Sequence, residues 1–66
     1  MFIKVTNASP ERAGDPILLN INSILSVYEN HEESGSLSTV IFSTNGLTWV
    51  IEESIEKVHS LIKAQK

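Results

Sequence analysis

The sequence predicts an α+β domain: a strongly bent, barrel-like antiparallel sheet of four or five short strands, followed by one C-terminal amphipathic helix. Three observations predict this fold. Short β-rich runs alternate with turn-forming residues over positions 2–52, the dipeptide Asn45-Gly46 stands between two of these runs, and helical periodicity is confined to the tail. The 66 residues form one domain, 1–66, because the chain holds no linker and no repeat.

The predicted strands are residues 2–6, 17–19, 24–28, 37–44 and 47–52. The second of these is so short that periodicity does not separate a strand from a buried helical turn. Residues 7–16 contain two prolines and one glycine, which predicts a loop between two strands. Residues 20–23 are predicted to form a tight turn, and residues 31–36 a charged loop.

Asn45-Gly46 is the strongest local signal in the chain. A two-residue type I′ hairpin turn requires a positive φ at both central residues, and Asn-Gly tolerates this best. With these two residues as the loop, Ile41 faces Val50 on the neighbouring strand. The predicted core face then carries the apolar side chains Val40, Phe42, Leu47, Trp49 and Ile51. The opposite face is polar except for Ile41 and Val50.

A turn centred on Ser34-Gly35 extends this register to the third strand, provided that the loop is neither longer nor bulged. Tyr28 then opposes Ile41, so that Tyr28, Ile41 and Val50 form one apolar row on the second face. Both faces therefore need cover, while the chain supplies one helix and two further short strands. Whatever stays uncovered predicts an interface with another protomer, at Tyr28, Ile41 and Val50.

The tail, residues 54–65, is predicted to be the helix. Ser54 is a favourable N-cap, and apolar residues recur at helical spacing, at Ile55, Val58, Leu61 and Ile62. The helix dipole favours an acid in the first turn and bases near the end, which fits Glu56, Lys63 and Lys66. Glu53 precedes Lys57 in the favourable i,i+4 order.

Composition excludes several classes of protein. The chain has no cysteine, so it has no disulfide scaffold, thiol nucleophile or thiolate metal site. No run approaches the ~18 apolar residues of a membrane span, and Lys4 and Pro10 interrupt any signal-peptide-like stretch. We therefore expect a soluble, intracellular, cytoplasmic protein. A formal net charge of −3 offers no basic surface for nucleic acid.

Size makes the isolated chain marginal. Burial of apolar surface should contribute roughly 95 kcal/mol, and ordering the chain should cost about 99 kcal/mol. The two quantities cancel within error. Chains this short are usually stabilised by a disulfide, a metal or a partner subunit, and the first is excluded here.

No set of side chains falls into a recognised catalytic frame, so we expect a non-enzymatic protein without a cofactor or bound metal. His31, Glu32 and Glu33 come closest to a metal-binding cluster, but a solvated charged loop explains them. Arg12 is the only arginine, and a guanidinium can bind phosphate or carboxylate through two hydrogen bonds. Arg12 and His31 are therefore the candidate ligand contacts.

The order of several short motifs carries a resemblance to a known family. These motifs are Ile3-Lys4-Val5-Thr6, Leu19-Asn20, Ile24, Val40-Ile41, Asn45-Gly46 and Val50-Ile51-Glu52-Glu53-Ser54-Ile55. The chain resembles the flagellar FlbD (SwrD) family of small bacterial proteins, which have a few β-strands and a C-terminal helix. Similar short proteins occur in phages and in bacteria without flagella, so the resemblance implies a fold more than a flagellar role. It implies no catalytic residue.

We therefore expect a non-enzymatic, homo-oligomeric protein-interaction module of the FlbD-like type. The alternative is a phage or bacterial protein that sequesters a small ligand such as a nucleotide at subunit interfaces, where Arg12, Tyr28 and His31 would meet. The third hypothesis is a nucleic-acid-binding module, because LytTR-type DNA-binding domains are similar in running strand, Asn-Gly turn, strand and helix. The acidic balance of the chain opposes this third hypothesis.

Overall fold

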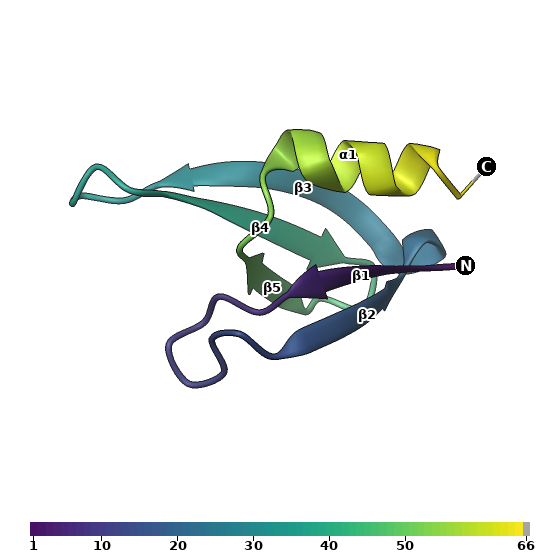
Figure 1. Ribbon diagram of the computed structural model, residues 1–66, viewed down its shortest axis with the longest axis horizontal. Coiled ribbons are helices and arrows are strands. Elements are labelled where there is room, and N and C mark those ends of the chain that lie inside the picture. The colour runs from purple at the N-terminus through teal and green to yellow at the C-terminus, as the bar shows by residue number, and fades with distance from the viewer. Residues whose placement is uncertain (66) are drawn as a thin grey trace.

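The computed structural model describes residues 1–65 and confirms the α+β class, with five short strands in two antiparallel sheets and one C-terminal helix (Figure 1). The elements are β1 (Phe2–Thr6), β2 (Pro16–Asn20), the 3₁₀ turn η1 (Ile21–Ser23), β3 (Ile24–His31), β4 (Leu37–Ser43), β5 (Thr48–Ile51) and α1 (Ile55–Lys63). The two sheets do not close into a barrel. Lys66, expected near the helix end, lies outside the described residues. Within residues 1–65, no helix is long and apolar enough to cross a membrane.

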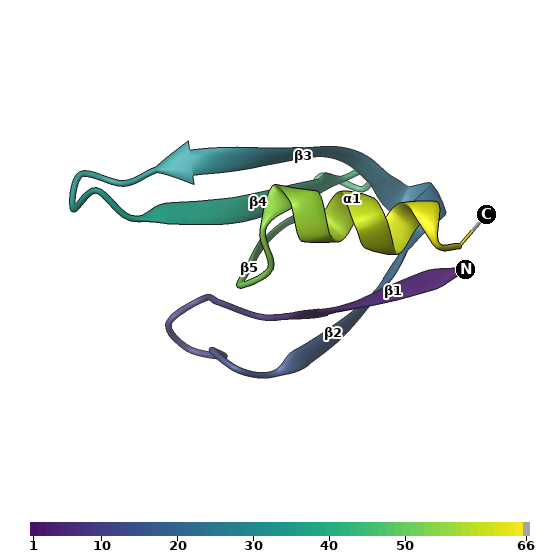
Figure 2. The ribbon, with the colours of Figure 1, turned by 45° about the horizontal axis from the view of Figure 1, so that its top comes forward.

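The core lies between two layers. One layer is the three-stranded sheet in the order β3-β4-β5, and the other combines the β1-β2 hairpin with α1 (Figures 1 and 2). Buried side chains from both layers form one cluster, which consists of Ile3, Val5, Leu19, Ile41, Ile51 and Val58. The hairpin and the helix therefore cover the same face of the three-stranded sheet, which we call the inner face.

The β4-β5 hairpin shows that the register predicted from Asn45-Gly46 is wrong by one residue. The Ser43 N–H donates to the Leu47 carbonyl (2.9 Å), and the Gly46 N–H donates to the Ser43 carbonyl (3.0 Å). Only the glycine of the dipeptide has a positive φ, at 87°. The connection is therefore a three-residue loop that ends in a glycine bulge. Asn45 instead accepts hydrogen bonds through its Oδ1, from the Ser43 hydroxyl (2.6 Å) and the Leu47 N–H (3.3 Å).

The β3-β4 hairpin is built in the same way. The Glu32 N–H donates to the Ser36 carbonyl and the Gly35 N–H donates to the Glu32 carbonyl, both at 2.9 Å. Gly35 has a φ of 90°. This loop is therefore also one residue longer than the turn centred on Ser34-Gly35, and its register is shifted by one residue in the same sense.

The shifted registers turn β4 over, because side chains alternate between the faces of a sheet. Ile41 pairs with Val27 and Trp49 rather than with Tyr28 and Val50, and it is fully buried in the core. The predicted row of Tyr28, Ile41 and Val50 is therefore not formed. Four of the five residues predicted on a common core face can now be placed: Trp49 and Ile51 do pack in the core, while Val40 and Phe42 lie on the outer face. The fifth, Leu47, is 52% exposed.

The helix is confirmed close to its predicted bounds. Ser54 is the N-cap, and its hydroxyl accepts a hydrogen bond from the Lys57 N–H (3.1 Å). Val58 is buried in the core, and Leu61 and Ile62 pack against it. The apolar stripe that predicts the helix is therefore the stripe that attaches it to the inner face.

The glycine bulge of the β4-β5 loop predicts the cost of replacing Gly46. A Cβ added at Gly46 would meet no heavy atom within 4 Å, so the cost comes from the backbone conformation alone. We expect Gly46→Ala to lower the free energy of unfolding by about 1 kcal/mol, measured by urea denaturation. Gly46→Asn is the matched variant and should lose less, because Asn tolerates positive φ better. Equal losses for Ala and Asn would contradict this account of the loop.

Candidate functional site

The outer face of the β3-β4-β5 sheet carries four apolar side chains that do not belong to the core. Tyr28, Val40 and Val50 form one row across the three strands, and Phe42 lies in the next row between Ser26 and Thr48. We call Tyr28, Val40, Phe42 and Val50 the outer patch. Tyr28 is 47% exposed, Phe42 and Val50 are half-buried, and Val40 is buried in the middle.

Among the described residues, the strand pairs place no charged side chain on the outer face between its ends. Besides the outer patch, the strand pairs place Ser26, Asn30, Ser38 and Thr48 on it. Carboxylates begin at its margins, where Glu32 precedes the β3-β4 loop and Glu52 follows β5. An apolar centre with a polar border is the usual composition of a protein-protein contact.

Strand β4 gives the sheet its two-sided character. Its inner positions are Leu37, Thr39, Ile41 and Ser43; Thr39 and Ser43 are buried polar groups, and Leu37 is exposed. Val40 and Phe42 point outward. The Ser43 hydroxyl lies within hydrogen-bond distance of Asn45 Oδ1 (2.6 Å) and the Leu47 carbonyl (2.9 Å), so its burial is satisfied. Two of the four apolar side chains of β4, Val40 and Phe42, are therefore on the outer face.

The structure separates the residues predicted for an interface. Tyr28 and Val50 lie on the outer face, in one row, whereas Ile41 is in the core and reaches no surface. Sequence reasoning missed Val40 and Phe42. The signal that could have found them is the glycine in each loop, because a three-residue loop with glycine at its end is the next most common hairpin connection.

The two predicted ligand contacts lie in different places. His31 is exposed at the end of β3, near the tip of the projecting β3-β4 hairpin (Figure 1). Arg12 is exposed in the β1-β2 loop and lines a cavity of about 470 Å³ with Asn7, Asp15, Pro16, Ile17, Leu18 and Trp49. Within one chain, neither His31 nor Tyr28 lines this cavity.

Hydrogen bonds hold the β1-β2 loop in shape at this cavity. Asn7 Oδ1 accepts from both the N–H (2.9 Å) and the hydroxyl (2.8 Å) of Ser9, and the Asn7 carbonyl accepts from the Gly14 N–H (2.8 Å). The Arg12 N–H donates to the Ser9 carbonyl (3.1 Å). Arg12 therefore projects from an ordered turn beside the half-buried ring of Trp49.

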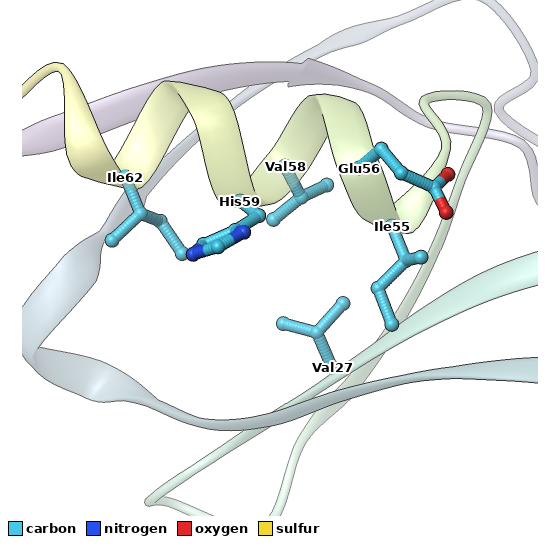
Figure 3. A pocket seen from close by; sticks show the side chains of 6 residues that line it. All are labelled: Val27, Ile55, Glu56, Val58, His59 and Ile62. Carbon is cyan, nitrogen blue, oxygen red and sulfur yellow. The ribbon is translucent and has the colours of Figure 1, made fainter.

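A second cavity, of about 440 Å³, lies between α1 and β3 (Figure 3). Four of its lining residues are apolar, namely Val27, Ile55, Val58 and Ile62. The exposed residues Glu56 and His59 complete the lining. In Figure 3 the side chain of Val27 points from β3 toward the helix. The helix and β3 therefore do not fully close on each other.

The described residues contain no cluster of side chains that could bind a metal ion. Among residues 1–65, no three His, Asp or Glu side chains come close enough to share an ion. His31, Glu32 and Glu33 occupy the end of β3 and the start of the following loop.

Glu53 ties the segment before α1 to the end of β1. Its two carboxylate oxygens accept from the N–H (2.8 Å) and the hydroxyl (2.9 Å) of Thr6. Partial burial raises the pKa of Glu53, but the hydrogen bonds from Thr6, a further backbone hydrogen bond and the charge of Lys57 lower it by more. The net pKa therefore lies below the ordinary value.

Comparison with protein-family models, with curated proteins and with solved structures finds no match for this chain. The fold and the surface define its class as a small α+β domain with a two-sided apolar sheet.

The lowered pKa of Glu53 predicts acid-sensitive stability. A carboxylate whose folded pKa is depressed contributes stability above its unfolded pKa, and this contribution is lost as the pH falls through the folded pKa. We expect the contribution of Glu53 to be complete at neutral pH and to be lost in acid, as the pH falls through the lowered folded pKa of this carboxylate. Glu53→Gln should destabilise the protein by about 1 to 2 kcal/mol at pH 7, measured by urea denaturation across pH.

The matched control is Glu52→Gln, which removes the same charge from the exposed neighbouring residue. Thr6→Val keeps the backbone donor and removes the hydroxyl, so it should cost less than Glu53→Gln. Because the two residues are in contact, the double variant should lose less than the sum of the two single losses. Additive losses would show that Thr6 and Glu53 do not act as a pair.

Proposed function

We propose that this protein is a small, non-enzymatic interaction module of the FlbD-like type, which assembles with further copies of itself through the outer patch. The observation that carries the proposal is the orientation of β4. Val40 and Phe42 lie on the outer face, while the inner face of the same strand buries Thr39 and Ser43. A strand that places apolar side chains on an uncovered face is adapted to cover from outside the chain.

Charge favours a second copy as the occupant of this face. Each chain carries a formal net charge of −3, so two copies repel wherever their acidic surfaces meet. The outer face is the part of the sheet without charged residues, from Ser26 and Thr48 at one side to Asn30 and Ser38 at the other. Two outer faces can stack as in a sheet sandwich, about 10 Å apart, without opposing like charges.

The exposed surface area of the chain is larger than that of an average compact protein of the same mass, which supports a partner subunit. The chain exposes 4617 Å², against about 4,200 Å² for an average compact protein of its mass. The β3-β4 hairpin projects from the rest of the fold (Figure 1). A standard interface takes about 800 Å² from each partner, roughly a sixth of this surface. The resemblance of the motif order to the FlbD (SwrD) family adds a fold-level argument for a small, non-catalytic module.

Charged substitutions in the outer patch test this proposal. Tyr28→Lys and Val50→Lys each place a cation on the outer face, where a symmetric contact would oppose it to its own copy. We expect each to weaken self-association about tenfold or more, measured by sedimentation equilibrium. The fluorescence of Trp49, the only tryptophan, reports whether the fold is intact.

Leu18→Lys is the matched control. It introduces the same charge at an exposed apolar residue (67% exposed) of β2, away from the outer face. A wild-type chain that stays monomeric at micromolar concentration would overturn the proposal. So would equal weakening by Leu18→Lys and Tyr28→Lys.

A second candidate function is the binding of a small anionic ligand such as a nucleotide. The observation that favours it is the cavity that brings Arg12 and Trp49 together, because a guanidinium suits a phosphate and an indole suits a flat ring. Asp15 lines the same cavity and would oppose an anion placed beside it. The proposed site therefore places the phosphate at Arg12 and the base over Trp49.

Nucleoside mono- and diphosphates are the probes for this second candidate. At a hundredfold excess over Kd, binding should add about 2.7 kcal/mol to the free energy of unfolding and so raise the melting temperature. It should also change the fluorescence of Trp49. Arg12→Ala should abolish both effects, whereas Lys4→Ala, which removes an exposed cation from β1, should preserve them. An unchanged melting temperature across the panel would exclude this function.

A further inference from the structure

We propose that two copies also contact each other through the free edge of β3, which pairs antiparallel with β3 of a second copy about a two-fold axis at Val27. This inference rests on the proposed self-association and adds a second contact to it. The outer patch then belongs to a continuous six-stranded sheet, three strands from each copy.

Within residues 1–65, strand β3 has a free edge. Its neighbour is β4, whereas the far side of β5 is occupied, because the Val50 carbonyl accepts from the Ala8 N–H (2.8 Å) and the Glu52 N–H donates to the Thr6 carbonyl (2.9 Å). The other strand with one neighbour, β2, has five residues and begins at Pro16, a residue typical of protected edges. β3 is the longest strand, with eight residues.

The hydrogen-bond pattern identifies the groups on this edge. In an antiparallel pair, successive residues point their backbone groups alternately toward and away from the partner strand. Because the Glu32 N–H bonds the Ser36 carbonyl on the β4 side, Ser26, Tyr28 and Asn30 also point toward β4. Val27 and Glu29 therefore present their N–H and C=O groups to the free edge.

Charge favours an axis at Val27 over an axis at Tyr28 or Glu29. If the axis lies at Val27, Val27 pairs with its own copy, Ser26 faces Tyr28, and the two Glu29 side chains lie far apart. An axis at Tyr28 would place each Glu29 diagonal to its copy, and an axis at Glu29 would oppose the two carboxylates directly. In the Val27 register each Glu29 faces the neutral Leu25 of the other copy.

The pairing also extends the apolar surface on both faces of the sheet, at Val27 on the inner face and at the outer patch on the outer face. Val27 lines the cavity between β3 and α1 (Figure 3). The second copy brings its own Val27 beside this residue on the inner face of the joined sheet. On the outer face, the two outer patches come to lie on one surface, with Tyr28 of each copy beside Ser26 of the other. Edge pairing therefore doubles the apolar face available for stacking.

Engineered cysteines test the register directly, because the chain has no native cysteine. Across the proposed contact, Ser26 and Tyr28 form a non-hydrogen-bonded pair with Cα atoms about 4.5 Å apart, which a disulfide can bridge. We expect rapid disulfide formation under mild oxidation when Ser26→Cys and Tyr28→Cys proteins are mixed, and little in either protein alone. A disulfide in Tyr28→Cys alone would overturn the Val27 register in favour of an axis at Tyr28.

Proline at Glu29 tests the edge itself. Glu29→Pro removes a backbone N–H that points away from β4, so the fold should persist, whereas the contact between copies should weaken about tenfold or more. Glu29→Ala keeps the N–H and should preserve the contact. Sedimentation equilibrium measures both, with far-UV circular dichroism as the check on folding.

The outcomes separate this inference from the proposed function. A monomeric wild-type chain overturns both. A wild-type oligomer that Tyr28→Lys weakens, but that Glu29→Pro leaves unchanged and the mixed cysteines do not cross-link, supports stacking through the outer patch and overturns pairing through β3. If Glu29→Pro fails to fold, the cross-linking of the mixed cysteine proteins still decides.

Discussion

The junction between the end of β1 and the segment after β5 is the constraint on which the rest of the fold depends. There the two separate sheets are joined through backbone hydrogen bonds of Thr6 and Ala8 to the β5 side, and through both carboxylate oxygens of Glu53 on Thr6. Because Glu53 directly precedes the N-cap Ser54, the same contact fixes where α1 begins. One carboxylate thus links the hairpin, the sheet and the helix, which is why its protonation should loosen all three.

The strands and the helix can be predicted from the sequence because each depends on a local pattern, such as the alternation of Ile3 and Val5 in β1 or the helical spacing that includes Val58. The register depends on the length of each hairpin loop, which the turn residues alone do not decide. Asn-Gly fits a two-residue turn, but Asn45 has a second option, since its Oδ1 can accept from Ser43 and Leu47. That option lengthens the loop by one residue, and a single residue decides which face of β4 meets the core.

The same reasoning explains why part of the candidate surface was predicted despite the wrong register. Both loops are longer by one residue, and both errors act on β4, the strand between them. The errors therefore cancel between β3 and β5, so Tyr28 and Val50 still share a row, and Val40 replaces Ile41 between them. Which cavity holds Arg12 could not be predicted, because it depends on how the β1-β2 hairpin lies against Trp49.

The orientation of β4 has a further physical meaning. If β4 were turned over, Val40 and Phe42 would enter the core in exchange for Ile41, and Thr39 and Ser43 would face water, where hydroxyls are better placed than methyl groups. The glycine loops impose the opposite arrangement, in which hydrogen bonds satisfy the buried hydroxyl of Ser43. Such a conflict between a strand's pattern and its packing is expected at functional surfaces. A contact between copies that covers the half-buried Phe42 would resolve it.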